Sequence, residues 1–227
     1  MKQSYEIEIK SLLGSKENAD VLRARMRAHD SDFHELGKTN KHLNHYFVGG
    51  DLPALRSVMT SYLDPAASEN LAATIAKAKE YSLRSRSADG KILLVLKVAM
   101  DNTTSANGTG RLEFEAPPEG LTLDDLDRLI LSCGFNYEAK WSREREEYLF
   151  CGAHVTIDKN AGYGYLAEFE IVAADAIQIE STKERLRGLM KTVGAEELDA
   201  ARLERMFAYY NAHWPDYYGT DKVFTVA

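Results

Sequence analysis

The 227 residues suit one large domain, and a hydrophobic fraction of 44% with 28% charged residues is ordinary for a soluble globular protein. The formal net charge of −7 argues against a general nucleic-acid or anionic-membrane binder, since both need a broad basic surface. The N-terminus has acids where a signal peptide needs apolar residues, and no apolar run approaches the ~18 residues of a membrane span. We therefore expect a cytoplasmic protein, with Cys133 and Cys151 as free thiols.

The first elements follow clear periodicities. Polar and apolar residues alternate strictly from Tyr5 to Leu12, which is the period of a β-strand. Apolar residues recur at helical spacing from about Lys16 to His29, which predicts an amphipathic helix. The segment His42–Val48 is rich in aromatic and branched residues and ends at Gly49-Gly50, so it predicts a second strand.

Residues 51–79 form an Ala-rich insertion broken by Asp64-Pro65, and two helices are the simplest interpretation. The second helix would have Ser68 as its N-cap. Its shared face would consist of Leu71, Ile75 and Ala78.

Strand patterns then return. Three further strands are predicted at Glu80–Ser87, Ile92–Ala99 and Arg111–Ala116. The polar segment Asp101–Gly110 between the last two is typical of a long hairpin loop. A clear amphipathic helix follows over Leu123–Cys133, capped by Thr122 and ended by Gly134.

The rest of the chain predicts three strands and two helices. The strands are expected at Trp141–Phe150, His154–Lys159 and Tyr165–Val172. The helices are expected at Ala174–Val193 and Glu197–His213, before an aromatic tail at Trp214–Tyr218. The prediction is thus eight strands in a single domain, 1–227, with the sheet over about 4–172, the insertion over about 51–79 and a helical C-terminal region over about 174–227.

Charged residues gather on one face of six of these strands. They are Glu6, Glu8 and Lys10; Arg84 and Arg86; Arg111, Glu113 and Glu115; Arg143 and Arg145; Asp158; and Glu168 and Glu170. A solvated sheet face is one interpretation, but such a face usually mixes in Ser, Thr and Gln. The amphipathic helices must cover the apolar face. We therefore predict an α+β fold with a closed eight-stranded antiparallel barrel, whose charged lumen would suit a polyanion with divalent metal.

The order of the motifs carries a resemblance to a known family. The motifs are Glu6-Ile-Glu8-Ile-Lys10 (ExExK), His45-Tyr46-Phe47, Leu83-Arg84-Ser85-Arg86 (LRxR), Leu96-Lys97, Arg111-Leu112-Glu113-Phe114-Glu115 (RxExE), Arg143-Glu144-Arg145 with Tyr148, and Asp158, Gly164 and Glu168-Phe169-Glu170. In this order they resemble the CYTH superfamily, the triphosphate tunnel metalloenzymes. Two departures are the long 51–79 insertion and Gly49-Gly50-Asp51 in place of a common Asp-Thr-Pro turn.

The resemblance implies a tunnel-shaped barrel that acts on small-molecule triphosphates with Mg²⁺ or Mn²⁺. The implied metal ligands are Glu6, Glu8, Glu168 and Glu170, with Asp158 as a further one. The implied phosphate-binding residues are Lys10, Arg84, Arg86, Lys97, Arg111, Arg143 and Arg145. Glu113 and Glu115 would orient these bases or hold a second metal. The implied catalytic set is Glu6, Glu8, Lys10 and Glu170.

Three functions stay open at this stage. Hydrolysis of tripolyphosphate, a nucleoside triphosphate or thiamin triphosphate is favoured over class IV adenylate cyclase activity, and a non-catalytic polyphosphate-binding module is the third possibility. Phosphoryl transfer needs charge neutralisation more than covalent help, so no Ser-His-Asp or Cys-His device is required, and the sequence shows none. His45 and His154 are interpreted as packed or surface residues, and the aromatic residues from Phe207 to Tyr218 as packing or a dimer contact. The chain is expected to be a monomer or a homodimer.

Overall fold

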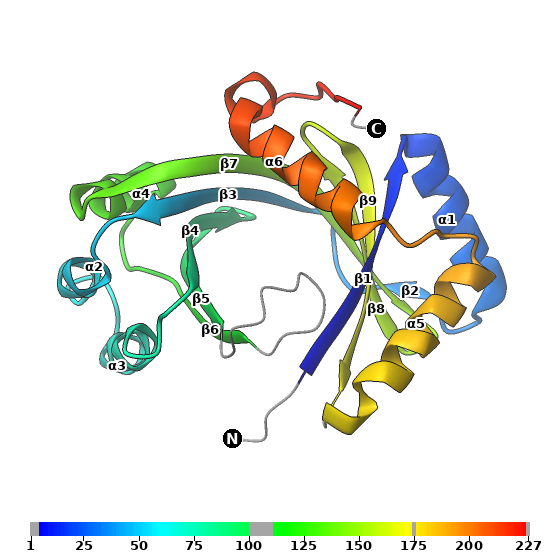
Figure 1. Cartoon of the computed structure of the whole chain (residues 1–227), viewed down its shortest axis with the longest axis horizontal. Helices are drawn as coiled ribbons and strands as arrows, with labels where there is room; N and C mark the ends of the chain where they lie inside the picture. Colours follow the sequence, from blue (N-terminus) through cyan, green and yellow to red (C-terminus); the bar gives the residue numbers. More distant parts are fainter. Residues whose placement is uncertain (1–4, 100–110, 174–175, 226–227) are drawn as a thin grey trace. The chain divides into compact units, whose positions relative to one another are not determined.

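The structure, a computed structural model, describes residues 5–99, 111–173 and 176–225 (Figure 1). The predicted hairpin loop 101–110 lies outside them. The described strands are β1 Tyr5–Gly14, β2 His34–Glu35, β3 Asn40–Gly49, β4 Tyr81–Ala88, β5 Lys91–Ala99, β6 Arg111–Ala116, β7 Phe135–Phe150, β8 Ala153–Asn160 and β9 Gly164–Ala173. The α-helices are α1 Lys16–His29, α2 Leu52–Met59, α3 Pro65–Ile75, α4 Leu123–Ser132, α5 Ile179–Thr192 and α6 Ala200–Tyr217.

The strands form one antiparallel sheet in the order β1-β9-β8-β7-β3-β4-β5-β6, with β2 added on β7. Within the described residues this hydrogen-bonded path ends at β1 and β6. The prediction of an α+β fold with a large antiparallel sheet is therefore confirmed. Closure of the sheet into a barrel by hydrogen bonds is not confirmed.

Several predicted details are wrong. The two-residue strand β2 raises the number of strands among the described residues to nine, and it is too short to show a periodicity. The N-cap of α3 is Asp64 rather than Ser68, because its side chain accepts a hydrogen bond from the Ala67 amide. The helix ends at Ile75, so Ala78 lies beyond it.

In the later part of the chain, some predicted boundaries also differ from those of the structure. Strand β7 begins at Phe135, six residues before the predicted start at Trp141. A short 3₁₀ turn, η1 Ala176–Gln178, precedes α5. Helix α6 continues through most of the predicted aromatic tail to Tyr217, with Pro215 inside its last turn.

The described residues group into two compact units. Unit 1 contains residues 5–40 and 143–225, and unit 2 contains residues 41–99 and 111–142. Strand β7 runs from unit 2 into unit 1. The expectation of a single domain remains a prediction.

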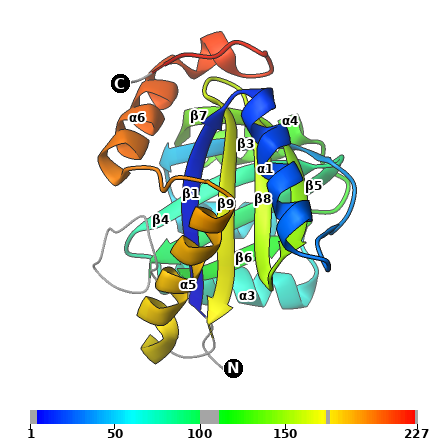
Figure 2. The same ribbon diagram turned by 90° about the vertical axis from the view of Figure 1, so that its right-hand side faces the viewer.

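Unit 1 packs helices on one face of β1, β9 and β8. Figure 2 shows α1 and α5 lying across the same side of these strands. The core between them consists mainly of Ile7, Ile9, Leu22, Met26, Val155, Ile157, Phe169, Leu186 and Met190. Each of these side chains stabilises the fold by roughly 1.5–3 kcal/mol on burial. Because side chains alternate along a strand, the residues between these apolar positions face away from the helices.

Unit 2 repeats this arrangement with other elements. Helices α2, α3 and α4 cover the apolar face of β3 to β6. The core consists mainly of Phe47, Leu55, Met59, Leu71, Leu83, Leu94, Leu96, Phe114, Leu126 and Ile130. Helix α4 begins with a capping box in which the side chains of Thr122 and Asp125 each bind the other's backbone amide. The predicted cap at Thr122 is confirmed.

Gly164, part of the closing motif, lies where no side chain fits. Its φ is +73°, and an added Cβ would lie 2.2 Å from the carbonyl oxygen of Gly14. Gly14 has a similar φ of +70°, but an added Cβ there would meet nothing within 4 Å.

Gly14→Ala should therefore cost about 1 kcal/mol of backbone strain alone. Gly164→Ala should cost about 1–3 kcal/mol more, because the clash is with backbone. Chemical denaturation of both variants measures the difference, and equal losses would contradict it.

Candidate functional site

Strand register brings the charged residues of unit 1 onto one face. Glu8 pairs with Glu170 and Lys10 with Glu168 between β1 and β9. Between β8 and β9, His154 pairs with Glu170 and Thr156 with Glu168. Between β7 and β8, Glu147 pairs with Thr156 and Arg145 with Asp158. Residues directly opposite each other share a sheet face. We call this set the mixed-charge face: Glu8, Lys10, Arg143, Arg145, Glu147, His154, Thr156, Asp158, Glu168 and Glu170.

Lys10 lies between two carboxylates of the mixed-charge face. Its Nζ is 2.5 Å from Oε1 of Glu8 and 3.4 Å from Oε1 of Glu168. The Lys10 side chain is 12% exposed. Burial lowers the pKa of Lys10, but the charges of Glu168 and Glu8 outweigh it and raise that pKa above its usual value. The lysine is therefore a fixed cation between an acid of β1 and an acid of β9.

Asp158 is held by two arginines of β7. Arg145 donates Nε to Oδ1 at 2.7 Å and Nη2 to Oδ2 at 2.6 Å, while Arg143 donates Nη1 to Oδ2 at 3.0 Å. The Asp158 side chain is 1% exposed. The Nη2 of Arg145 also donates to Oε2 of Glu168 at 3.0 Å. Burial lowers the pKa of Arg145, but these two carboxylates raise it overall.

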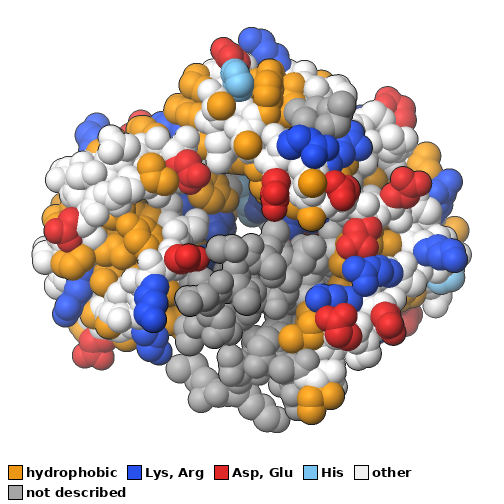
Figure 3. Space-filling model, viewed as in Figure 1, with side chains coloured by type: hydrophobic (Ala, Val, Ile, Leu, Met, Phe, Trp, Pro, Cys, Tyr) orange, Lys and Arg blue, Asp and Glu red, His pale blue; other side chains and the backbone are white. Residues whose placement is uncertain are grey.

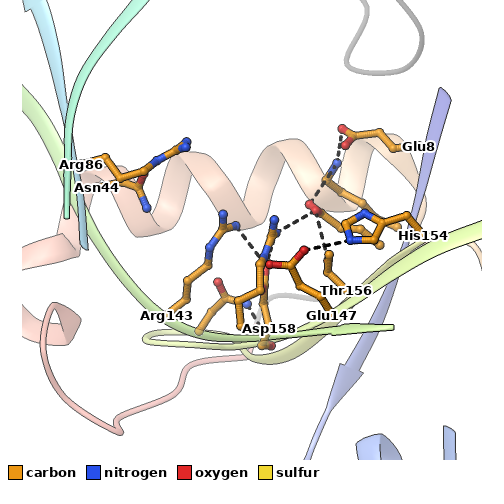
Figure 4. A network of polar contacts seen from close by, with 12 residues as sticks. Glu8, Asn44, Arg86, Arg143, Glu147, His154, Thr156 and Asp158 are labelled. Carbon is orange, nitrogen blue, oxygen red and sulfur yellow. Dashed lines mark hydrogen bonds and ion pairs between the residues drawn. The ribbon is translucent and has the colours of Figure 1, made fainter. Parts of the chain in front are cut away.

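Three further residues of this face, Glu147, His154 and Thr156, were not predicted as functional. His154 Nε2 lies 2.9 Å from Oε2 of Glu147, and both side chains are about one-third exposed (Figure 4). Thr156 donates to Oε2 of Glu168 at 3.5 Å, a long contact. Sequence reasoning interpreted His154 as packed or surface. Its position two residues before Thr156 and four before Asp158 was the available signal that it shares their face.

The open face of unit 2 carries a second set of charges. Arg84 donates Nη1 to the hydroxyl of Tyr46 at 3.1 Å, and its Cζ lies 4.9 Å from the centroid of that ring. Arg86 donates Nε to Oδ1 of Asn44 at 2.9 Å, as Figure 4 shows. Its Nη1 donates to Oε2 of Glu115, also at 2.9 Å.

Lys97 completes this set. Its Nζ lies 2.9 Å from Oε2 of Glu113 on the neighbouring strand β6. Glu113 and Glu115 thus pair with Lys97 and Arg86. Whether they orient these bases or hold a second metal stays a prediction. We call this set the arginine face: Asn44, Tyr46, Arg84, Arg86, Lys97, Glu113 and Glu115.

The structure does bring a serine, a histidine and an aspartate together, on the covered face of unit 2. The Asp127 carboxylate accepts from Ser85 Oγ at 2.5 Å and lies 2.6 Å from His45 Nδ1. Both Ser85 and His45 bind the aspartate, whereas a hydrolytic triad needs the serine on the histidine. All three residues are at most 2% exposed. This cluster is therefore a buried polar network, and His45 is packed as predicted.

Two predicted site residues lack described side chains. Glu6 and Arg111 lie in β1 and β6, but their side chains fall outside the described part of the chain. Their predicted roles stay predictions.

The chemistry of the mixed-charge face fits a hard divalent cation. Glu8, Glu168 and Glu170 supply carboxylate oxygens, the ligands that Mg²⁺ and Mn²⁺ prefer. Cross-strand pairing of Glu8 with Glu170 keeps these acids on one face. Among the described residues, no three His, Cys, Asp or Glu side chains are gathered as a ready metal centre. Lys10 lies between two of the acids, so a bound metal would have to compete with that ammonium group.

The exposed charges of α5 differ from those of this face. Figure 3 shows acidic and basic side chains intermixed on the side of the molecule where α5 lies. Their ion pairs, such as Lys183 with Glu180 and Arg187 with Glu197, include side chains up to 80% exposed. Such exposed pairs contribute little to stability, so they are ordinary surface charges. None of the described helices is both long and apolar enough to cross a membrane.

The CYTH domain family matches residues 62–203. The chain therefore belongs to this family, as the order of its motifs predicted. The match begins after β1 and therefore does not include the ExExK strand.

Solved structures with the same fold come from distant organisms. A conserved hypothetical protein of Pyrococcus furiosus is 17% identical, with a TM-score of 0.56 over 85% of this chain and 92% of its own. A candidate adenylate cyclase of Vibrio parahaemolyticus is 15% identical, with a TM-score of 0.56 over 92% of this chain and 99% of its own. A candidate adenylyl cyclase of Hippeastrum, described as having a dominant triphosphatase activity, is 19% identical, with a TM-score of 0.51 over 90% and 96%. Comparison with curated protein sequences gives no match.

The pKa of Glu168 gives a testable pH dependence. Burial raises this pKa, but Lys10, Arg145 and Arg143 outweigh burial and lower it from 4.5 to about 2. A carboxylate with a lowered folded-state pKa stabilises the fold above its unfolded pKa, and this contribution is lost as pH falls from 4.5 toward 2. The free energy of unfolding of the wild type should fall by roughly 2–3 kcal/mol more over this range than that of Glu168→Gln.

Urea denaturation between pH 5 and pH 2 measures this difference. The exposed Glu196 offers a matched control, and Glu196→Gln should keep the pH slope of the wild type. Parallel slopes for the wild type and Glu168→Gln would contradict the assignment of Glu168 as an ionised acid held by three cations.

Proposed function

We propose that the chain is a divalent-metal-dependent phosphohydrolase that acts on a triphosphate: inorganic tripolyphosphate, a nucleoside triphosphate or thiamin triphosphate. The observation that carries the proposal is the mixed-charge face, where Lys10 and Arg145 are held between acids from β1, β8 and β9. Partly buried charges of both signs are costly to desolvate unless they are paired or bind a ligand. A polyanion with its metal satisfies both signs at once.

In this proposal Glu6, Glu8, Glu168 and Glu170 would hold Mg²⁺ or Mn²⁺. When bound, such a metal would neutralise phosphate charge and would lower the pKa of a coordinated water. Asp158 was also expected as a ligand, but both of its oxygens accept hydrogen bonds from arginines. We therefore assign Asp158 the role of aiming Arg143 and Arg145 at phosphate.

The cations would bind phosphate oxygens. Lys10, Arg143 and Arg145 serve this role in unit 1. Lys97, Arg84, Arg86 and Arg111 are the candidates in unit 2. The Nε atoms of Arg84 and Arg143 are buried and, among the described groups, have no hydrogen-bond partner. Each guanidinium thus keeps part of its donor capacity for a ligand. Phosphoryl transfer depends mainly on such positioning and charge stabilisation.

Membership of the CYTH domain family supports action on a triphosphate, and the described triphosphatase activity of the Hippeastrum relative favours hydrolysis over cyclisation. A closed barrel, a cytoplasmic location and a monomeric or dimeric state belong to the same proposal. In the cyclase alternative the ribose hydroxyl would attack in place of water.

The first test is an activity assay that combines each metal ion with each candidate triphosphate. Purified protein with Mg²⁺ or Mn²⁺ should release phosphate from at least one triphosphate, and EDTA should abolish the release. Product analysis with ATP separates ADP and phosphate from cyclic AMP and pyrophosphate. Cyclic AMP as the main product would assign the cyclase reaction. Triphosphate binding without turnover would assign a non-catalytic binding module.

Two substitutions test the roles of the two faces. Glu170→Gln should weaken metal binding and lower metal-dependent turnover by roughly 10²-fold or more, because it removes a charged ligand. Arg86→Ala should raise KM for the triphosphate and spare metal affinity, because Arg86 would bind phosphate and not the metal. Kinetics over a metal titration separate the two effects. Full activity in Glu170→Gln would make the metal assignment untenable. Exposed Asp216→Asn serves as a charge-matched control and should match the wild type.

A further inference from the structure

The buried network around Asp127 joins four elements of unit 2. Asp127 lies on the covered side of α4 and is 2% exposed. Its Oδ1 accepts from Ser85 of β4, and its Oδ2 accepts from the hydroxyl of Tyr137 of β7 at 2.6 Å. His45 of β3 lies 2.6 Å from the same Oδ2, and Lys140 Nζ lies 3.8 Å away. One carboxylate thus connects α4 to three strands.

The hydrogen-bond donors around Asp127 favour the ionised form of its carboxylate. Burial raises its pKa, but hydrogen bonds from His45, Ser85 and Tyr137 outweigh burial and lower that pKa below its usual value. An ionised carboxylate can only accept hydrogen bonds, so each of these three groups must donate. A buried charge of this kind costs several kcal/mol to desolvate, and an apolar residue would pack there without that cost. The network therefore calls for a role other than simple packing.

The position of the network in the register indicates that role. His45 and Ser85 are directly paired across β3 and β4. The pairs on either side are Asn44 with Arg86 and Tyr46 with Arg84. Both flanking pairs lie on the opposite face, where each arginine is hydrogen-bonded to its partner. A slip of one residue between the strands would turn the arginines toward the apolar core.

We propose that Asp127 is a positioning residue for phosphate binding: it fixes the His45–Ser85 pair and thereby sets the direction of Arg84 and Arg86. This inference rests on the proposed function. Asp127 touches no substrate, and it acts only through the strand pair that it holds from the covered face. Loss of its charge should therefore impair phosphate binding by the arginine face and leave the metal ligands of unit 1 unchanged.

The test compares Asp127→Asn with a variant of the same helix that loses packing alone. Asp127→Asn should raise KM for the triphosphate by roughly tenfold, with kcat and metal affinity close to wild type. Leu126→Ala removes a fully buried side chain of α4 and should lower the melting temperature without raising KM, when assayed well below that temperature. Exposed Asp124→Asn should change neither quantity. Equal KM in Asp127→Asn and wild type would overturn the inference.

A double-mutant cycle gives a readout that general destabilisation would not produce. In an Arg84→Ala/Arg86→Ala background, Asp127→Asn should raise KM no further, because the residues that it positions are gone. Additive effects would overturn the inference. If Asp127→Asn fails to fold, Ser85→Ala and Tyr137→Phe replace it. Ser85→Ala should then raise KM more than Tyr137→Phe, since Ser85 lies between the two arginines, and equal effects would count against the proposal.

Calorimetry separates failure of this inference from failure of the proposed function. Wild-type protein with Mg²⁺ is titrated with inorganic tripolyphosphate, nucleoside triphosphate and thiamin triphosphate. A wild type that binds none of them contradicts the proposed function, and this inference falls with it. If the wild type and folded Asp127→Asn bind one of these triphosphates equally tightly, the result contradicts this inference and leaves the proposed function standing.

Discussion

The carboxylate of Glu168 is the interaction on which the mixed-charge face depends. It is 18% exposed, and it contacts Lys10 from one side and Arg145 from the other. Lys10 also forms an ion pair with Glu8, and Arg145 also forms one with Asp158. Acids and bases therefore alternate in a continuous chain across β1, β9, β8 and β7. Removal of any one charge leaves a neighbour without its partner in a poorly solvated place, which is more costly than the absence of the whole pair.

This chain of charges is possible because the opposite side of the same strands is apolar. Ile7, Ile9 and Phe169 alternate with Glu8, Lys10 and Glu168, and helices α1 and α5 cover them. The strands of unit 1 are thus fixed by packing on one side, and the charged side chains on the other side start from rigid positions. Fixed positions reduce the reorganisation that a phosphate and metal site needs during the reaction.

Much of this arrangement could be predicted from the sequence because a strand has a period of two. Glu8 and Lys10, or Arg84 and Arg86, must share a face once the strand is recognised, and the order of the motifs identified the family. The contacts between strands could not be predicted, because register depends on tertiary pairing. The short strand β2 was missed because two residues show no periodicity. The cap at Asp64 was missed because Ser68 is also of a residue type that caps helices. Asp127 was missed because an acid in an amphipathic helix usually faces solvent.

Asp127 and Glu168 show two ways to keep a carboxylate ionised away from water. Glu168 relies chiefly on cations, whose attraction is strong but can be replaced by another cation that approaches the same oxygens. Asp127 relies mainly on His45, Ser85 and Tyr137, whose hydrogen bonds fix direction and distance. The first arrangement suits a site that exchanges its counter-ions for metal and substrate. The second suits a fixed structural contact, and its partners His45 and Ser85 lie between the pairs of Arg84 and Arg86 in the register of β3 and β4.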